Sequence, residues 1–538
     1  MTPVSRGHGV AVRNCLAPSL YIRNMHTQVT PVRGAIHRID PEDDVAVAIR
    51  QLEPGETVAL GESGGSGDSS GASLYVRELI PRGHKLAVRK ISAGNPVRKY
   101  GWPIGQAKHD IPAGSLVHTD NLTTLLTGLN RYEYQPAAPV RAAAAGFEQP
   151  LQFMGYRRKG GRVGTRNEIW VVSTVGCVTR TAERIARLGA ERYAGHVDGI
   201  HALTHPFGCS QLGDDLAHTR RILASLIMHP NAGGVLVVGL GCESNQLDKL
   251  LAEAGDYDRS RVRAFNAQTS DDELEEGLAA LSELVQLASC DEREPCPLST
   301  LSIGLKCGGS DGFSGITANP LVGRIADQVS AAGGTPILTE IPEVFGAEQL
   351  LMRRAVDAHV FEDVVSVVNS FKQYFLDHGQ PIYENPSPGN IAGGITTLEE
   401  KSLGAVQTGG RAPVSEVVLY GQRASRPGLV LLESPGNDAV SSTALVAAGA
   451  TILLFTTGRG TPLGFPVPTL KIASNSALAR KKPRWIDFDA GQVLEGTTMD
   501  EAAHELMRLV IETASGKPAR NELNDEREIA IWKTGVVL

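Results

Sequence analysis

The sequence lacks the features that mark nucleic-acid-binding, membrane-spanning or disulfide-stabilised proteins. Its 538 residues carry 52 Lys and Arg against 59 Asp and Glu, so there is no basic excess for nucleic acid. No uninterrupted apolar run reaches the roughly 18 residues that a membrane-spanning helix needs. The 7 cysteines are odd in number and widely scattered, which favours reduced thiols over a disulfide framework. We therefore expect a cytoplasmic protein with neither a nucleic-acid nor a membrane partner.

Two common phosphate-binding motifs are also missing, since the chain has no GxxxxGK[ST] and no GxGxxG that properly follows a strand. Glycine, in contrast, is abundant at 59 residues. One glycine-rich stretch, "KCGGSDGFSGITANP" from Lys306 to Pro320, combines a cysteine with four glycines and several small polar residues. A core strand or a plain spacer would not need this combination. It suits a backbone that approaches a small polar ligand closely.

The N-terminal quarter of the chain predicts a leader, a small β domain and a linker. The first 28 residues contain arginine but no acid, which fits a transit peptide, a disordered leader, or translation from Met25. We favour a disordered leader over 1–33. Short apolar stretches broken by Gly and Pro predict an all-β domain over 34–125, with a Gly/Ser-rich hairpin tip at 61–72. The Pro- and Ala-rich segment that follows predicts a linker over 126–150.

The rest of the chain predicts an α/β fold. The apolar runs "EIWVVSTVGC", "GGVLVVGLGC" and "LSIGLKCGGSDG" alternate with long helix-like stretches, a pattern typical of mainly parallel sheets. We predict a central α/β domain over 151–414 and a C-terminal α/β domain over 415–538. Ligands of such sheets bind at the carboxyl ends of the strands, where these runs end in cysteine and glycine.

Thiols and imidazoles are the first candidate functional groups. Cys177, Cys209, Cys242 and Cys307 each lie beside a predicted strand end or turn, and thiolates bind soft or borderline metals, including iron. The alternative is that they are small buried hydrophobic residues, and their spacing gives no ligand geometry. His84, His118 and His205 also lie near turns, where histidine serves as a metal ligand, a general base or a surface residue.

Three polar loops are candidates for binding substrate. The loops are "ENPSPGN" with Asn385, Ser387 and Asn390, "SPGNDAVS" with Asn437 and Asp438, and "TTGRGTPLG" with Arg459 and Thr461. Arg459 stands between two glycines just after an apolar run, so it suits a bidentate contact with a carboxylate. The alternative is a structural arginine paired with a distant acid.

Taken together, these strings resemble the altronate/galactarate dehydratase family. The motifs that carry the resemblance are "GRVGTRNEIW", "HPFGCSQLGDD", "GLGCESNQ", "KCGGSDGFSGITANP", "GGTPILTEIPEVFGAEQLL", "ENPSPGN", "SPGNDAVS" and "FTTGRGTPLG". The β unit, with "RGHKLAV" and "KYGWPIG", is similar to the family's SAF domain. The resemblance runs from about residue 36 to Leu538, and "CSQLGDD" and "PRWIDFDAGQ" look like the altronate branch. The Gly/Ser-rich hairpin tip looks longer than is usual in the family.

The resemblance implies a sugar-acid dehydratase that converts D-altronate to 2-dehydro-3-deoxy-D-gluconate and water. It also implies a divalent metal, iron(II) by preference and manganese(II) as the alternative, with a 4Fe–4S cluster as a less favoured option. The C2 proton beside a carboxylate is a very weak acid, so the enediolate must be stabilised electrostatically. We also expect a homo-oligomer, with a dimer as the expected state.

We assign site residues on this basis. The expected catalytic residues are His84, His205, Lys306 and Asp311. The expected substrate-binding residues are Ser310, Asn319, Asn385, Ser387, Asn390, Asn437, Asp438, Arg459 and Thr461. The expected metal ligands are His84, Cys177, Cys209, Cys242 and Cys307. The alternative functions are a galactarate dehydratase or sulfolactate sulfo-lyase of the same family, and a non-catalytic protein that binds sugar acids.

Overall fold

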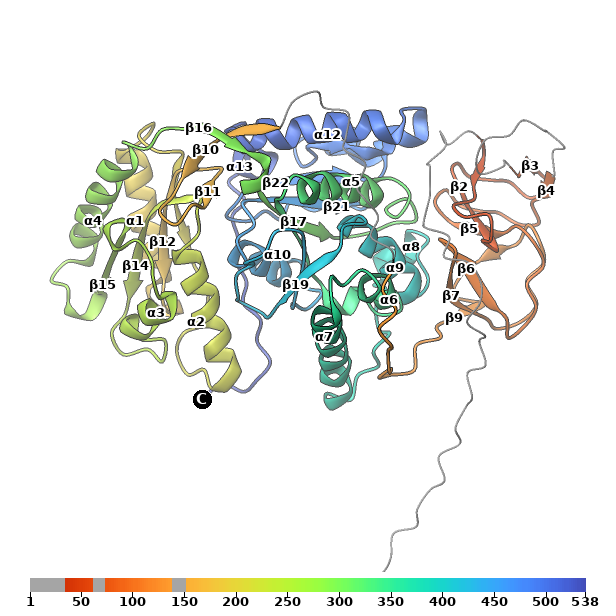
Figure 1. The fold of residues 1–538 in the computed structure, drawn as a ribbon, viewed down its shortest axis with the longest axis horizontal. Coiled ribbons are helices and arrows are strands. Elements are labelled where there is room, and N and C mark those ends of the chain that lie inside the picture. The colour runs from red at the N-terminus through yellow and green to blue at the C-terminus, as the bar shows by residue number, and fades with distance from the viewer. Residues whose placement is uncertain (1–33, 61–72, 138–150) are drawn as a thin grey trace, which may run out of the picture.

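The computed structural model describes residues 34–60, 73–137 and 151–538. The predicted leader (1–33), the predicted hairpin tip (61–72) and residues 138–150 of the predicted linker lie outside the described residues. Figure 1 shows three parts side by side, with the β domain at one end, a large α/β unit in the middle and a smaller α/β domain at the other end. No helix among the described residues is long and apolar enough to cross a membrane.

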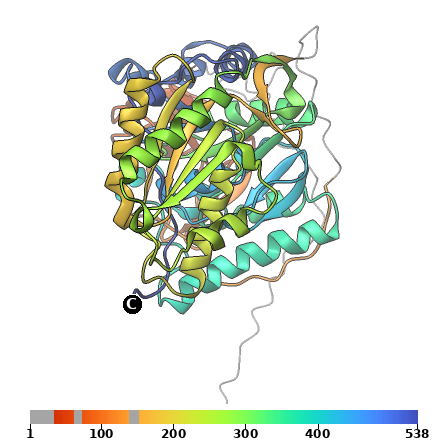
Figure 2. The same cartoon turned by 90° about the vertical axis from the view of Figure 1, so that its left-hand side faces the viewer.

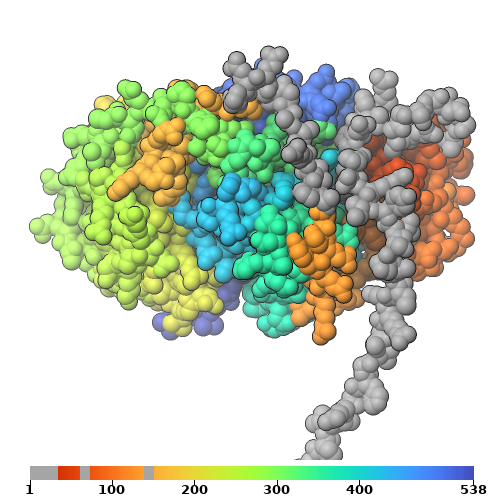
Figure 3. All heavy atoms as spheres, viewed as in Figure 1, coloured from red at the N-terminus to blue at the C-terminus, as the bar shows by residue number. Residues whose placement is uncertain are grey.

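The N-terminal domain is built from short antiparallel strands, as predicted for an all-β unit. Its three sheets pair β1-β2-β5-β8, β3-β4 and β6-β7-β9. The strands are β1 (Ile36–His37), β2 (Val45–Ala48), β3 (Thr57–Ala59), β4 (Ser73–Tyr75), β5 (Lys85–Ala87), β6 (Pro96–Lys99), β7 (Trp102–Ala107), β8 (Leu116–Val117) and β9 (Leu122–Thr123). In the space-filling view this domain packs against one end of the central unit (Figure 3).

The second domain contains a four-stranded parallel sheet in the order β13-β12-β14-β15. Its strands are β12 (Glu168–Ser173), β13 (Gly199–Leu203), β14 (Ala232–Gly239) and β15 (Val262–Asn266). Every residue of β12 and β14 is buried, because helices cover both faces of the sheet. Helices α1 (Thr179–Arg192) and α4 (Glu273–Ala288) form one layer, while α2 (Gly213–Ile227) and α3 (Leu247–Ala254) form the other (Figure 2).

The large central unit is a seven-stranded parallel sheet in the order β19-β20-β18-β17-β21-β22-β23. Its strands are β17 (Ser302–Cys307), β18 (Thr335–Leu338), β19 (Val414–Val418), β20 (Leu429–Leu432), β21 (Ile452–Thr457), β22 (Thr469–Ala473) and β23 (Phe488–Asp489). The predicted boundary between residues 414 and 415 is wrong, because β17 pairs directly with β21 and β18 with β20. The two α/β units instead meet near β16 (Glu294–Pro297), which pairs with β10 (Gln152–Arg157), itself paired with β11 (Val163–Gly164).

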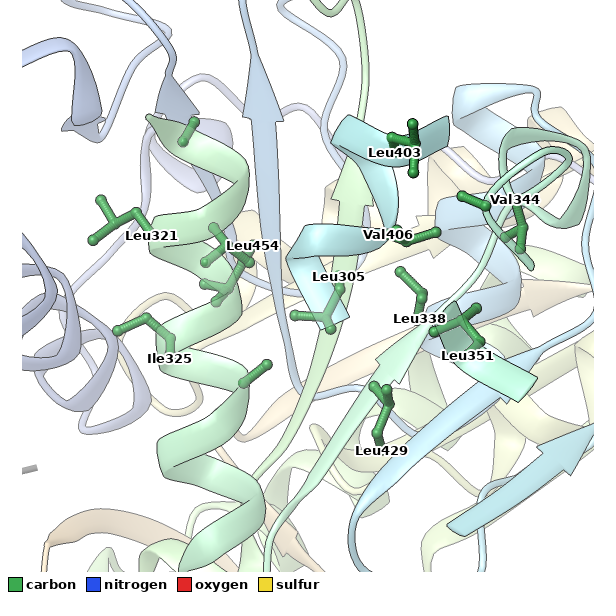
Figure 4. Close-up of a cluster of buried hydrophobic side chains, with 14 of the residues drawn as sticks. Leu305, Leu321, Ile325, Leu338, Val344, Leu351, Leu403, Val406, Leu429 and Leu454 are labelled. Carbon is green, nitrogen blue, oxygen red and sulfur yellow. The ribbon is translucent and has the colours of Figure 1, made fainter. Parts of the chain in front are cut away.

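Helices pack around the seven-stranded sheet. They are α5 (Ala318–Ala331), α6 (Glu348–Met352), α7 (Ala358–Asp377), α8 (Pro388–Ala392), α9 (Leu398–Ala405), α10 (Asp438–Ala447), α11 (Ser476–Lys481), α12 (Met499–Ala514) and α13 (Arg520–Leu523). Figure 4 shows leucines of β17 and β18 packed against α5 and the turn after α9. A second core is shared between α2 of the second domain and α10, so the two sheets are joined by apolar packing.

Candidate active site

The loop that follows β17 is the hub of the candidate site. The backbone N–H groups of Gly458 and Arg459 donate to the Gly309 carbonyl at 3.1 and 3.0 Å, which ties this loop to the one after β21. Gly309 is exposed and has a φ of 65°, a conformation that favours glycine. The loop therefore stands at the carboxyl edge of the seven-stranded sheet, where ligands of such sheets bind.

Two glycines of the loop are needed for contact with the N-terminal domain. A Cβ atom on Gly312 would lie 1.9 Å from the Gly83 carbonyl oxygen, and one on Gly315 would lie 2.3 Å from the Tyr100 hydroxyl. No side chain fits at either distance. Much of the glycine content of the "KCGGSDGFSG" string is thus explained by close packing between domains, and Gly309 is the glycine of the string that stays exposed.

This docking brings His84 to the central unit, since His84 directly follows Gly83. A Cβ atom on Gly394 would lie 3.3 Å from the His84 Cα atom. The His84 ring stacks on the His118 ring with centroids 5.4 Å apart, and His118 Nε2 lies 3.2 Å from the Ile391 carbonyl oxygen. Burial lowers the pKa of both imidazoles, which favours their neutral forms at neutral pH.

A buried ion triad holds the N-terminal domain in this position. Lys85 Nζ and Lys99 Nζ each lie 2.8 Å from a carboxylate oxygen of Glu400, which belongs to α9. Lys85 also donates to the Gly394 carbonyl at 3.2 Å. Burial lowers the pKa of Lys85 to about 8, against the pull of Glu400. Two ammonium groups from one domain therefore share one carboxylate from the other.

A second buried cluster lies at the end of β17 itself. Lys306 Nζ is 2.5 Å from Glu340 Oε1 and 2.6 Å from Asp438 Oδ1. Burial alone would lower the pKa of Lys306, but the Asp438 and Glu340 carboxylates outweigh it and raise that pKa. Asp438 is the first residue of α10, where the helix dipole stabilises a carboxylate, and its side chain is 38% exposed. Asp438 therefore connects the buried Lys306 to the surface.

The "ENPSPGN" segment lies beside this cluster and divides into two roles. Asn385 accepts a hydrogen bond from Lys401 Nζ at 3.0 Å and donates to Glu343 Oε1 at 3.3 Å. Asn390 donates to the Ser310 carbonyl at 2.8 Å and accepts from the exposed Ser387, so it fastens this segment to the loop. Asn390 is buried and acts structurally, while Ser387 stays available at the surface.

Arg459 and its neighbours emerge at the same edge of the sheet. Arg459 is exposed, and among the described residues it has no ion-pair partner. Asn437 caps α10 by accepting hydrogen bonds from the Ala439 and Val440 N–H groups at 3.1 Å. Thr461 is half-buried and accepts from the Leu463 N–H group at 3.2 Å. Exposed and without an ion pair to a described residue, Arg459 stays a candidate for binding a ligand.

Several assigned residues have their polar atoms committed to the protein. Asp311 Oδ1 accepts from the Phe313 and Ser314 N–H groups and from the Ser474 hydroxyl, and its Oδ2 accepts from Asn475. These hydrogen bonds show that the Asp311 carboxylate shapes the loop. Ser310 and Asn319 are buried and contact the Cys307 sulfur at 2.8 and 3.4 Å. Burial raises the pKa of the Cys307 thiol, which disfavours the thiolate that a metal would need.

The other predicted ligands belong to the second domain. Cys177, Cys209 and Cys242 are exposed and follow β12, β13 and β14, whereas Cys307 ends a strand of the other sheet. His205 is buried, with Nε2 3.0 Å from the Ser173 carbonyl oxygen and Nδ1 accepting from the Phe207 N–H group. Burial lowers the pKa of His205 to about 4. These contacts give His205 a structural role in its own loop.

Sequence reasoning missed the buried charges that surround the site: Lys85, Lys99, Glu340, Glu343, Glu400 and Lys401. One signal was available in "TEIPEVFG", where two acids stand directly after an apolar strand. Charged residues are almost never fully buried unless they are paired. Glu340 and Glu343 could therefore have been identified as candidates from the sequence. Their partners could not, because they come from distant segments.

Comparisons with known proteins agree with this arrangement of parts. Three family models match: the altronate/galactarate dehydratase SAF domain over 35–125, the D-galactarate dehydratase/altronate hydrolase second domain over 155–289, and the D-galactarate/altronate dehydratase C-terminal domain over 298–537. The chain is 50% identical to the altronate dehydratase of Escherichia coli over 506 residues, 93% of this chain and 99% of the relative. It is 47% identical to the Bacillus subtilis altronate dehydratase, at the same coverage of both chains. The galactarate dehydratase (L-threo-forming) of E. coli is more distant, at 34% identity over 82% of this chain and 88% of the relative.

Proposed function

The chain belongs to the altronate/galactarate dehydratase family, and from that premise we propose that it removes water from D-altronate to give 2-dehydro-3-deoxy-D-gluconate. One observation carries the site assignment. At one edge of the central sheet, Asp438 reaches the surface from a buried ion pair with Lys306. The loops that carry Arg459 and His84 contact the same Gly-rich loop, Arg459 at Gly309 and the His84 turn at Gly312.

In this proposal Arg459 binds the carboxylate of the substrate and thereby orients C2. A guanidinium makes two parallel hydrogen bonds to a carboxylate, which fixes both position and angle. Asn385, Ser387 and Thr461 lie on neighbouring loops and offer polar atoms to the hydroxyl groups of the sugar acid. Thr461 follows Arg459 by two residues, so it is held by the same turn.

Asp438 is the proposed general base. Its carboxylate takes the C2 proton, and the resulting acid passes that proton to the departing C3 hydroxyl, which leaves as water. The proton count therefore balances within one turnover. The enediolate formed between these steps needs nearby positive potential, which the Lys306 ammonium supplies. Gly309 is exposed, and its backbone N–H group donates no hydrogen bond to another described residue, so it is available to an oxyanion.

We further propose that turnover uses a divalent metal, iron(II) by preference and manganese(II) as the alternative. The residues present fit such an ion only in part. His84 offers a neutral imidazole whose Nε2 makes no hydrogen bond to another described residue. No group of three His, Cys, Asp or Glu side chains among the described residues is placed to hold a metal ion. A bound ion would act as a Lewis acid on the substrate carboxylate and 2-hydroxyl. These two substrate groups would have to supply ligands that the described residues do not.

Removal of metal is expected to abolish turnover. After chelation, activity should return on adding iron(II), and His84→Ala should raise the iron(II) concentration needed for half-maximal recovery by at least tenfold, the usual scale for losing a ligand's support. Visible absorbance near 400 nm, a general property of 4Fe–4S clusters, would favour the cluster held by exposed cysteines instead. A chelated preparation with full turnover would overturn the metal proposal.

The substrate assignment is tested by a panel of sugar acids. We expect kcat/KM for D-altronate to exceed that for galactarate and for sulfolactate by at least a hundredfold, because a misplaced carboxylate or hydroxyl leaves buried polar groups unpaired. Higher kcat/KM for galactarate would move the chain to the other branch of the family. Binding of sugar acids without turnover would favour the non-catalytic alternative. A dimer and a cytoplasmic location stay predictions.

A further inference from the structure

Behind Asp438 lies a buried cluster with more carboxylates than ammonium groups. Lys306 contacts Glu340 and Asp438, and Lys401 Nζ lies 2.8 Å from Glu343 Oε1. Three carboxyl groups thus face two ammonium groups. If all five were ionised, the cluster would carry one uncompensated negative charge while four of its five groups are buried and only Asp438 reaches water, which is unfavourable.

One carboxylate oxygen of this cluster is left without a partner. Glu343 Oε2 is buried and makes no hydrogen bond to any described residue. The side chain of Glu343 is only 5% exposed, so bulk water does not compensate for the missing bond. A buried carboxylate oxygen that accepts nothing is costly, and it points to a donor that completes the site.

A small cavity reaches the same carboxylates. Its volume is about 10 Å³, close to the smallest space that holds one water molecule. The apolar part of its wall includes Leu305, Leu338 and Val406, which Figure 4 shows gathered together. Its polar lining comes from Cys307, Thr339, Glu340, Glu343 and Thr408. The site therefore has both the room and the polar groups that a bridging water requires.

The backbone conformation of Glu340 is strained, which independently indicates a functional role for this residue. Glu340 has φ 68° and ψ 61°, the left-handed conformation that non-glycine residues rarely adopt. Such strain costs about 1–3 kcal/mol and tends to cluster at functional sites. Here it aims the Glu340 carboxylate at Lys306 and at the Cys307 N–H group.

We propose that Glu340 is protonated and donates a hydrogen bond, through a water in this cavity, to the unpartnered carboxylate oxygen of Glu343, which leaves Asp438 as the charged partner of Lys306. The proposal rests on the proposed function and deepens it by naming Glu340 and Glu343 as positioning residues. With Glu340 neutral, Lys306 pairs with a single carboxylate, Asp438, and the cluster as a whole is neutral. An anionic substrate can then approach Asp438 without meeting a buried excess of negative charge.

The charges around Glu340 agree with this proton count. Burial raises the pKa of Glu340 to about 8, Lys306 opposes the rise, and Glu343 and Asp438 add to it. The Cys307 thiol is the remaining titratable group in the cavity wall, and burial keeps it protonated. Because the folded state binds a proton that the unfolded state releases above about pH 4.5, this group makes the protein less stable as pH rises from about 4.5 to 8.

The first test is independent of turnover. In infrared spectra of the full-length protein at pH 7, the difference between wild type and Glu340→Gln should contain the carbonyl band of one protonated carboxylic acid. In wild type this band should disappear as pH rises through about 8. Glu343→Gln removes the neighbouring like charge, so the midpoint of the transition should fall by about one unit or more.

Glu348→Gln is the matched control. Glu348 is a buried glutamate 2.8 Å from the buried Lys372, but in this pair the charges balance. Its replacement should leave the pH-dependent band unchanged. A band that persists in Glu340→Gln, or a wild-type protein with no such band, would overturn the proposal whether or not D-altronate is the substrate.

The second test uses substrate. The KM of the anionic sugar acid should rise at least threefold in wild type between pH 7 and 9, because ionised Glu340 adds a buried negative charge beside the site. In Glu340→Gln this rise should be absent, with kcat at pH 7 within about tenfold of wild type. A wild-type pH profile retained by a folded Glu340→Gln would show that the residue is merely structural.

Discussion

Asp438→Asn is expected to lower kcat by about 10²- to 10⁴-fold, the scale for losing a general base. The amide keeps the shape of the side chain and still accepts a hydrogen bond from Lys306, but it cannot take the C2 proton. Lys306 retains its contact with Glu340 at 2.5 Å, and loss of the Asp438 charge favours the ionised form of Glu340, so the ammonium keeps a charged partner. We therefore expect KM to change only a few-fold. Steady-state kinetics on D-altronate measure both parameters.

The control for this variant is Asp500→Asn in α12, another aspartate in the first turn of a helix. Asp500 is 83% exposed and pairs with Arg324, so its replacement tests the general effect of exchanging a helix-terminal, ion-paired carboxylate for an amide away from the site. Both variants should unfold at temperatures within a few degrees of wild type. If a folded Asp438→Asn enzyme keeps more than a tenth of wild-type kcat, Asp438 is not the base.

Arg459→Lys is the second large expected effect. A charged bidentate contact contributes about 2–4 kcal/mol to transition-state binding, so kcat/KM should fall roughly 30- to 1,000-fold. An ammonium keeps the charge but cannot form the planar two-bond fork, so the lysine variant should already be poor. Stability should be unaffected, because Arg459 is exposed and no ion pair with another described residue is lost.

The comparison variant is Arg187→Lys on α1, an exposed arginine that pairs with Glu191 of the same helix. It should keep wild-type kcat/KM. Arg459→Ala extends the test, since it should lose still more activity while unfolding at the same temperature as wild type. Wild-type kcat/KM in Arg459→Lys, or loss of activity in Arg459→Ala that comes only from unfolding, would exclude the carboxylate contact.

Several parts of the fold could be predicted from the sequence because the pattern that indicates them lies within one segment. The runs "EIWVVS" and "LSIGLKC" predicted buried parallel strands, and they form β12 and β17. A strand covered by helices on both faces must be apolar throughout, so its sequence alone reveals it. The polar loops that follow these strands were readable for the same local reason. Arg459, flanked by two glycines, is the clearest example within the site.

The family resemblance extended this reading to the activity, because whole motifs matched and not single residues. It did not extend to roles within the motifs. From the sequence, Asp311 was expected to be catalytic and Asn390 to bind substrate, yet their side chains hold loops together in the structure. A polar residue in a turn bonds either to the backbone around it or to a ligand, and the local sequence is the same in both cases.

The sequence by itself determined the α/β class, the small N-terminal β domain, the positions of the main buried strands and the loops at their carboxyl ends. The tertiary structure alone decided which strands are neighbours, so the division predicted at residue 414 failed when β17 paired with β21. It also decided that Lys306, Glu340 and Asp438 meet, and that Lys85 and Lys99 bring His84 to the central unit by binding Glu400. The physical reason is that an apolar run specifies that a strand is buried but not which other strand it pairs with. The packing of the whole chain sets the order of the strands and the docking of the domains. The same packing brings together the charged residues of the site.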